Sequence, residues 1–255
     1  MKFLTAVHTD VGLRKKTNQD SVLVMQADTS AGPVLLASVC DGMGGLAKGE
    51  VASAAMVHVL ADWFTNSFPV LLSNGFDAEA LRLDWEHLVS DTARRITAYG
   101  ASIHVDMGTT AAVFLVVGDT YYIMNIGDSR VYALTDRLYQ LTKDQTYVQR
   151  EIDMGRMTFE QAASDPQRNV LLQCIGASAV IQPDFFAGRL APEQTYLLCC
   201  DGFRHVIQPQ EIYQALGPSA VSDEESMHSA LVNLTELNKK RREEDNISAI
   251  LIRTC

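Results

Sequence analysis

Several aspartates in this chain stand where an apolar, strand-like run of residues begins or ends. They are Asp41, Asp128, Asp201 and Asp245. A carboxylate at the end of a buried strand costs free energy unless a cation or a hydrogen-bond donor pairs with it. A single Asp-Gly pair, such as the one at Asp41, is typical of a turn. Four carboxylates at the ends of separate apolar runs instead indicate one shared set of ligands.

The ligand types indicate which ion this set would bind. All the ligands are oxygens, with no paired histidine or cysteine, which suits a hard ion such as Mg²⁺ or Mn²⁺ better than zinc. Gly42 has no side chain, so its backbone carbonyl can approach the same ion as Asp41. Two such ions that share a bridging carboxylate can activate a water and hold the oxygens of a phosphoryl group during in-line displacement. The residues therefore favour metal-dependent hydrolysis of a phosphoester.

Strands must position these carboxylates. Runs rich in branched and aromatic residues predict strands at 21–26, 34–40, 111–117, 120–126, 131–134, 196–200 and 247–252. Between two of these strands, Gly118-Asp119 suits a tight hairpin, because glycine accepts a positive φ without steric cost. Hairpins of this kind favour antiparallel sheets.

Helices are predicted between and after the strands. Apolar residues recur at steps of three and four over 81–99, with Gly100 expected as the C-terminal cap. A second helix, 50–64, has so narrow a polar face that it should lie deep against a sheet. A third should begin at Ser222, with Glu225 completing a capping box. Because the two early helices stand together between groups of strands, we expect an α+β fold rather than a doubly wound one.

The composition excludes several classes of protein. With 47% hydrophobic and 20% charged residues, the chain is too apolar for intrinsic disorder and long enough to bury one core. Its formal net charge of -10 makes nucleic acid and anionic membranes poor partners. The five cysteines show no C-x-x-C spacing, and Cys199 and Cys200 are expected to be buried thiols. We expect a cytoplasmic protein with no membrane span, folded as a single monomeric domain over 1–255.

Six short motifs occur in an order that resembles one known family. They are Asn18-Gln19-Asp20, Asp41-Gly42-Met43-Gly44-Gly45, Gly108-Thr109-Thr110, Gly127-Asp128-Ser129-Arg130, Asp201-Gly202 and Asp245-Asn246-Ile247-Ser248. Over nearly the whole chain, from His8 to Ile252, they resemble the PP2C-type (PPM) metal-dependent serine/threonine protein phosphatases, most closely the compact bacterial members. The resemblance implies a four-layer α-β-β-α sandwich with two central antiparallel sheets.

The resemblance also implies roles for individual residues. Asp41 would bridge two Mn²⁺ or Mg²⁺ ions, with the Gly42 carbonyl on the first, and Asp201 and Asp245 would hold the second. Asp20 would act on that second site directly or through a water. Asp41, Asp201 and Asp245 would be the catalytic residues.

A weaker third ion is also implied, held by Asp128 together with Asp201. Next to this site the chain departs from the family pattern. Phe203-Arg204-His205 stands where relatives usually have a smaller or aliphatic residue and then a hydroxyl or acidic one. The departure would alter the rim of the third site without removing a ligand.

Other departures concern phosphate binding and proton transfer. Lys15 stands where an arginine usually binds the substrate phosphate, with Arg14 one place earlier. Lysine keeps the charge but loses the two-pronged donor fork, so Lys15, Arg14 or neither side chain would bind phosphate. Gln19 replaces a common glutamate. Met43 replaces the histidine that eukaryotic members place there as a candidate general acid, so the proton for the leaving group must come from elsewhere.

The leading hypothesis is a bacterial signalling enzyme that hydrolyses phosphoserine and phosphothreonine in proteins by direct attack of a metal-activated water, opposing a Ser/Thr kinase. One alternative is a catalytically weak scaffold of the same fold that binds phosphoproteins or a kinase. Another is a metal-dependent hydrolase of a different phosphoester. The segment 144–168 corresponds to the flap beside the family's cleft, and would either select substrates or be an ordinary surface insertion.

Overall fold

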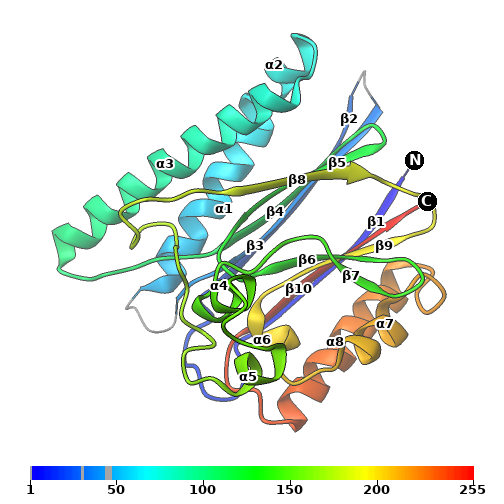
Figure 1. The fold of residues 1–255 in the computed structure, drawn as a ribbon. Helices are drawn as coiled ribbons and strands as arrows, with labels where there is room; N and C mark the ends of the chain where they lie inside the picture. Colours follow the sequence, from blue (N-terminus) through cyan, green and yellow to red (C-terminus); the bar gives the residue numbers. More distant parts are fainter. Residues whose placement is uncertain (1, 30–31, 44–47) are drawn as a thin grey trace.

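The computed structural model of the protein describes residues 2–29, 32–43 and 48–255. Its strands are β1 (Phe3–Asp10), β2 (Asp20–Thr29), β3 (Gly32–Asp41), β4 (Ala111–Val117), β5 (Thr120–Ile126), β6 (Arg130–Leu134), β7 (Leu138–Gln140), β8 (Asp184–Arg189), β9 (Thr195–Cys199) and β10 (Ile247–Thr254). Its helices are α1 (Gly49–Asn66), α2 (Phe68–Ser73), α3 (Ala78–Ile103), α4 (Tyr147–Asp153), α5 (Phe159–Ser164), α6 (Asp201–Arg204), α7 (Pro209–Leu216) and α8 (Glu224–Lys240). Figure 1 shows their arrangement.

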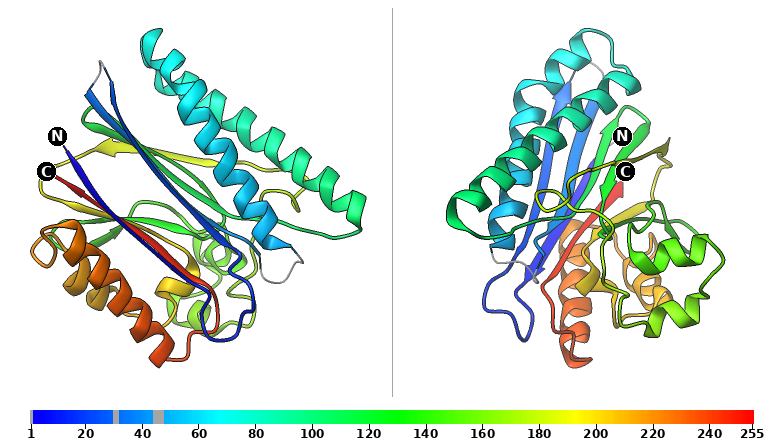
Figure 2. Two further views of the ribbon diagram at one scale, coloured as in Figure 1. Left: turned by 180° about the vertical axis from the view of Figure 1, so that it is seen from behind. Right: turned by 60° about the vertical axis from the view of Figure 1, so that its left-hand side comes forward.

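Two five-stranded sheets lie face to face at the centre of the molecule. One has the order β1-β10-β9-β6-β7 and the other β2-β3-β4-β5-β8, and neighbouring strands are antiparallel. Helices α1 and α3 cover the outer face of the second sheet, and α7 and α8 cover the outer face of the first (Figure 2). The predicted α+β fold, a four-layer α-β-β-α sandwich, is confirmed.

Strand β3 shows why the central strands are almost entirely apolar. Leu35, Ala37 and Val39 point into the core between the sheets, whereas Leu36 and Cys40 point toward the helices on the other face. A strand that is buried on both faces has no position where a polar side chain reaches water. The run 34–40 is therefore apolar except for the buried Ser38, and the first charged side chain, Asp41, comes at the strand's end.

The predicted hairpin is present. β4 and β5 are antiparallel neighbours in which Val117 pairs with Thr120, and Gly118 turns the chain with a φ of 63°. The helices predicted at 50–64 and 81–99 correspond to α1 and α3. Strands β1, β7 and β8 were not predicted.

The predicted end of the long helix is wrong. α3 continues past Gly100 to Ile103, and His104 is the C-cap, with a left-handed φ of 54°. Gly100 is required for a different reason, because a Cβ there would lie 2.4 Å from the carbonyl oxygen of Val105. The glycine allows the chain after the helix to fold back closely against its last turn.

The predicted cap of the last helix is also displaced by one residue. Asp223, not Ser222, is the N-cap of α8, and its carboxylate accepts a hydrogen bond from Ser226 N at 2.8 Å. The Ser226 side chain completes the capping box instead of Glu225. A charged cap also interacts favourably with the positive end of the helix dipole. Within the described residues, no helix has both the length and the apolar character needed to cross a membrane.

Candidate active site

Asp41 and Asp20 lie opposite each other at the end of the β2-β3 pair. Asp41 is the last residue of β3, Asp20 is the first residue of β2, and the two are partners in the antiparallel register. Directly opposed residues have Cβ atoms about 4.5–5.5 Å apart on one face of the sheet. The strand pairing therefore brings two carboxylates together.

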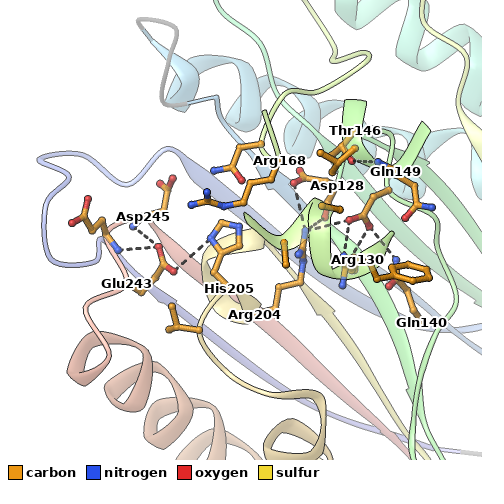
Figure 3. A pocket seen from close by; sticks show the side chains of 18 of the residues that line it. Asp128, Arg130, Gln140, Thr146, Gln149, Arg168, Arg204, His205, Glu243 and Asp245 are labelled. Carbon is orange, nitrogen blue, oxygen red and sulfur yellow. Dashed lines mark hydrogen bonds and ion pairs between the residues drawn. The ribbon is translucent and has the colours of Figure 1, made fainter. Parts of the chain in front are cut away.

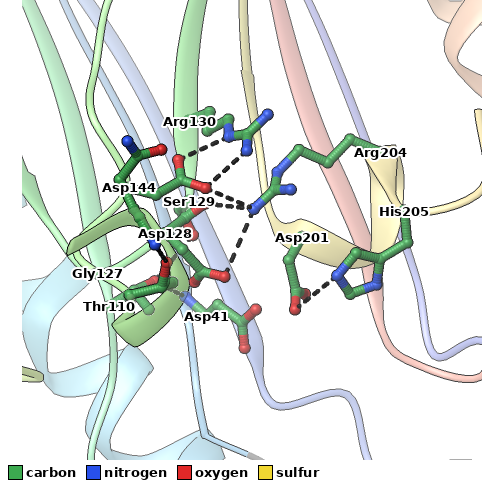
Figure 4. Close-up of polar contacts among 12 residues, drawn as sticks. Asp41, Thr110, Gly127, Asp128, Ser129, Arg130, Asp144, Asp201, Arg204 and His205 are labelled. Carbon is green, nitrogen blue, oxygen red and sulfur yellow. Dashed lines mark hydrogen bonds and ion pairs between the residues drawn. The ribbon is translucent and has the colours of Figure 1, made fainter. Parts of the chain in front are cut away.

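Asp201 and Asp245 come from the other sheet. Asp201 begins α6 just after β9, and Asp245 precedes the neighbouring strand β10. A Cβ on Gly202 would lie 2.2 Å from the carbonyl oxygen of Asn246, so the glycine allows α6 to contact the segment that carries Asp245. Figure 4 shows the carboxylates of Asp41 and Asp201 directed toward the same space.

Three carboxylate oxygens at this centre lack hydrogen-bond partners among the described residues. Both oxygens of Asp20 and the Oδ1 atom of Asp201 are buried without a hydrogen-bond partner. Ligand atoms of Asp20, Asp41 and Cys200 lie within 4.8 Å of one another. Unpaired buried carboxylates are costly, and a divalent cation is the partner that such oxygen ligands fit.

The electrostatics agree with this fit. Burial raises the pKa of Asp41 well above its ordinary value, and the neighbouring carboxylates of Asp20 and Asp201 raise it further. Burial raises the pKa of Asp20 to about 7. Nearby donors lower this pKa, and the charge of Asp201 raises it further. Cations bound here would favour the ionised carboxylates and reverse both shifts.

Cys200 is buried, as the sequence predicted, and its sulfur lies beside the carboxylates. The thiol contacts the Asn246 carbonyl at 3.4 Å and accepts a hydrogen bond from Ser248 N at 3.1 Å. Burial raises the pKa of the thiol well above its ordinary value. Because metals bind the thiolate, we assign Cys200 to packing and not to the ligand set.

The backbone at Gly42 is closely surrounded. A Cβ there would lie 2.4 Å from the carbonyl oxygens of Gln19 and Gly49, so only glycine fits. Gly44 and Gly45 of the same motif lie outside the described residues.

The Gly108-Thr109-Thr110 motif ties the end of β3 to the turn that carries Asp128. Asp41 N donates a hydrogen bond to Thr110 Oγ1 at 2.9 Å. The same hydroxyl lies 2.9 Å from Ser129 Oγ. This connection fixes Asp41 and Asp128 relative to each other, although neither threonine was assigned this role from the sequence.

Asp128 lies beside a cation of the protein itself. Arg204 Nη2 donates to the backbone oxygen of Asp128 at 2.9 Å and lies 3.5 Å from its Oδ2. Burial and Asp201 raise the pKa of Asp128 to about 7, against the lowering effect of Arg204. The carboxylate that the family resemblance assigns to a third ion thus faces a guanidinium.

Lys15 and Arg14 contact different carboxylates. Lys15 Nζ lies 2.8 Å from Asp245 Oδ1, and its side chain is 28% exposed. Arg14 is 72% exposed and pairs with Glu244. Burial disfavours the charge on Lys15, but the hydrogen bond to Asp245 outweighs it and raises the pKa of the ammonium. Of the two candidates for phosphate binding, Lys15 is the one directed at the carboxylate centre.

A cleft of about 1070 Å³ lies beside the carboxylate centre, and its lining includes Lys15, Asp128 and Asp245 together with residues of α4 and α5. Figure 3 shows Asp245, Glu243 and His205 on one side of the cleft and Thr146 and Gln149 on the other. The cleft is large enough for a phosphorylated side chain and its flanking residues.

Two acidic residues of this cleft were not found from the sequence. Asp144 accepts two hydrogen bonds from Arg130. Burial alone would raise the pKa of Asp144, but the pairing with Arg130 outweighs burial and lowers it. Glu243 accepts a hydrogen bond from Asp245 N at 3.0 Å and lies 3.5 Å from His205 Nδ1. Glu243 follows a basic run that reads as a solvated end, so its burial had no local signal.

Comparisons with known proteins agree on one family. A family model described as protein phosphatase 2C matches residues 12–251. The serine/threonine phosphatase stp of Listeria innocua is 30% identical over 191 residues, covering 73% of this chain and 71% of that protein. The serine/threonine protein phosphatase PstP of Mycobacterium tuberculosis is 37% identical over 171 residues, covering 67% of this chain and 30% of that longer protein.

Solved structures extend the likeness to the fold. The serine/threonine phosphatase of S. agalactiae superposes with a TM-score of 0.85 at 28% identity, and all of both chains is covered. The catalytic domain of PstP in complex with two manganese ions superposes with a TM-score of 0.77 at 28% identity, covering 98% of this chain and 97% of that one.

Proposed function

This chain belongs to the protein phosphatase 2C family of metal-dependent serine/threonine protein phosphatases, and we propose that its carboxylate centre removes phosphate from phosphoserine and phosphothreonine in proteins. The observation that carries the assignment is the group of unpartnered carboxylate oxygens on Asp20 and Asp201 around Asp41. A bound cation would give these oxygens the partner that they lack.

Four aspartates and one backbone carbonyl would hold two metal ions. Asp41 would bridge them with the Gly42 carbonyl on the first ion, Asp201 and Asp245 would hold the second, and Asp20 would act directly or through a water. When bound, the ions activate the attacking water and neutralise charge on the phosphoryl oxygens. The ions would be Mn²⁺ or Mg²⁺, and the relative solved with two manganese ions supports that choice.

The protein's own side chains would orient the substrate. Lys15 reaches the centre from the 11–17 loop and would pair with the phosphate oxygens once they displace it from Asp245. Met43 has no proton to give, so the leaving oxygen would be protonated by water or another group. The substrates would be proteins phosphorylated by a Ser/Thr kinase, and their phosphorylated residue would enter through the cleft.

We further propose that 144–168 is a flap that contributes to substrate choice. It carries α4 and α5, and Phe159 at the start of α5 is 72% exposed while lining the cleft. An exposed aromatic side chain beside an active site can contact the peptide around the phosphorylated residue. Phe159→Ser should raise KM for a phosphopeptide and leave KM for a small aryl phosphate unchanged, whereas equal effects on both substrates would argue against this role.

The function is tested by phosphate release from a phosphothreonine peptide across a manganese titration. We expect metal-dependent turnover that falls by about a hundredfold or more in Asp41→Asn and Asp201→Asn, because each removes a metal ligand. Asp62→Asn, an equal charge change on the exposed face of α1, is the matched control. Variants that match the wild type at the first two positions would contradict the proposal.

The same assay separates the alternatives. A scaffold would bind the phosphopeptide at saturating metal with little turnover. A hydrolase of another phosphoester would prefer phosphotyrosine or nucleotides over phosphothreonine. The four carboxylates favour the enzyme, because a binding module has no evident need for unpaired buried aspartates.

A further inference from the structure

The Arg204 guanidinium lies between two aspartates at the edge of the carboxylate centre (Figure 4). Its Nη2 atom is 2.9 Å from the Asp128 backbone oxygen, 3.5 Å from Asp128 Oδ2 and 3.6 Å from Asp144 Oδ2. The Arg204 side chain is only 12% exposed. Because arginine keeps its charge in proteins, this is a permanent buried cation.

Arg204 is held in place from the far side as well. Asp144, which it approaches, is fixed by a two-pronged pair with Arg130, at 2.7 Å to Nε and 2.6 Å to Nη2. Arg130 is fixed in turn by a hydrogen bond of 2.8 Å to the Tyr132 hydroxyl. Two arginines and two aspartates therefore balance each other, and Asp128 already has its counter-charge without a metal.

The second carboxylate assigned to a third ion is also engaged on one side. Asp201 Oδ2 lies 3.3 Å from His205 Nε2, and His205 Nδ1 lies 3.5 Å from Glu243 Oε2. Asp201 Oδ1 is the unpartnered atom. Asp201 therefore has one oxygen available for the two-metal centre, and the other is occupied by a ring nitrogen.

We propose that the Arg204 guanidinium takes the place of the family's third metal ion, so that this phosphatase binds two divalent ions and carries its remaining cation as a side chain. The inference rests on the proposed function for the two-metal part of the centre. Asp128 then positions Arg204 instead of binding a metal. A divalent ion on Asp128 would share its carboxylate with the guanidinium and would be repelled by it.

This assignment also explains the unusual Phe203-Arg204-His205 sequence. Arg204 ends α6, whose first residue is the proposed metal ligand Asp201, so the short helix carries an anion and a cation to the same site. Arg204 also lines the cleft. A fixed cation there needs no loading from solution, so the manganese dependence of turnover should show no separate phase at high metal concentration.

Counting bound manganese tests the inference directly. After equilibrium dialysis against excess Mn²⁺, we expect two ions per chain in the wild type and in Asp128→Asn. Arg204→Met removes the cation while keeping most of the side-chain volume, and it should gain a third, weaker ion. That ion should be lost again in the double variant Arg204→Met/Asp128→Asn.

Arg130→Met is the matched control. Like Arg204, Arg130 places a positive charge beside Asp144, but it does not contact Asp128. We expect it to bind two ions. A third ion in this control would show that local net charge, and not the place of Arg204, sets the count, and would overturn the inference. The inference would also be overturned if the wild type bound three ions and Asp128→Asn bound one fewer. It would equally be overturned if a folded Arg204→Met bound only two ions.

Folding and function are kept separate in this design. If Arg204→Met does not fold, the comparison of the wild type with Asp128→Asn still shows whether Asp128 holds a third ion, which would overturn the inference. Turnover is measured on the same samples. Three bound ions with full turnover would refute only the role of Arg204, whereas two bound ions without turnover would refute the proposed function and leave the ion count standing.

Discussion

Lys15 and Arg14 are adjacent in sequence but are placed in different surroundings by the 11–17 loop. Lys15 is partly buried beside Asp245, and Arg14 extends into solvent beside Glu244. An exposed ion pair contributes little, whereas a charge-assisted bond inside a cleft contributes about 1.5–3 kcal/mol. The two side chains should therefore contribute unequally to substrate binding.

Lys15→Met should raise KM for a phosphothreonine peptide about tenfold, in line with the loss of one charge-assisted hydrogen bond. Arg14→Met, the matched control, should change KM by less than about twofold. Steady-state kinetics at saturating manganese measure both. The opposite ranking would assign the phosphate to Arg14, and equal small effects would mean that neither side chain binds it.

The raised pKa values predict how metal removal changes stability. The pKa of Asp20 is about 7 in the folded protein, against an ordinary value of 3.8. Between these two pH values the folded protein holds a proton that the unfolded chain has released. Stability of the metal-free protein should therefore fall as pH rises from about 4 to about 7. The raised pKa of Asp41 acts in the same direction.

Thermal unfolding in a chelator should thus give a higher Tm at about pH 5.5 than at about pH 8. Asp20→Asn should reduce this difference, because an amide does not titrate. Saturating manganese should abolish it, since the ions stabilise the ionised carboxylates that the protons otherwise neutralise. A metal-free Tm that rises over this interval and is insensitive to Asp20→Asn would contradict the assignment.

At the scale of elements, the short helix α6 sets the position of one metal ligand by contact with the segment before β10. Gly202 makes this contact possible because a Cβ there would meet the Asn246 carbonyl oxygen at 2.2 Å. Backbone cannot yield as a flexible side chain can. The helix, and Asp201 with it, must therefore move when this position acquires a side chain.

Gly202→Ala should weaken manganese binding about tenfold or more, because it separates Asp201 from Asp245 and distorts the coordination. Isothermal titration calorimetry measures the affinity. Gly155→Ala is the control, since that glycine has a φ of 68° and open space around it. The control should cost about 1–2 kcal/mol of folding stability and leave metal affinity unchanged. Unchanged affinity in Gly202→Ala would show that α6 can shift without disturbing the centre.

At the scale of the whole molecule, the two sheets share a core that also supports the site. Phe114 on β4 is fully buried and packs against Tyr196 on β9 at 5.3 Å and Tyr121 at 5.5 Å between ring centroids. Contacts of this kind hold the two halves of the carboxylate centre at a fixed separation. The prediction of a single domain over 1–255 implies that both layers unfold together.

Phe114→Ala should lower the free energy of unfolding by about 3–5 kcal/mol, the usual cost of removing a buried ring. Both tryptophans, Trp63 and Trp85, lie in the α1–α3 layer, so their fluorescence reports that side, whereas far-UV circular dichroism reports the whole molecule. In urea the two signals should coincide, before and after the substitution. Val70→Ala, at a 56% exposed position, should change stability by less than about 0.5 kcal/mol. Separate transitions would mean two folding units.

The sequence by itself determined the features that neighbouring residues control. The continuous apolar run of β3, the glycine turn of the β4-β5 hairpin and the helical periodicity of α3 each leave a local pattern, and the strand-end aspartates follow directly from those elements. These patterns predicted the α+β class, and the resemblance of the six ordered motifs predicted the four-layer sandwich and the phosphatase family; all three predictions are correct. The strands β1, β7 and β8 were missed because an edge strand's partner is chosen by distant packing.

Only the tertiary structure decided which distant groups meet. The Thr9 and Ser248 hydroxyls, 239 residues apart, lie 2.8 Å from each other, and Arg204 reaches Asp128 across 76 residues. No local pattern records such contacts, because they arise when the two sheets pack and a buried charge must find its partner. The sequence marked Arg204 only as unusual, and the fold made it the counter-charge of Asp128.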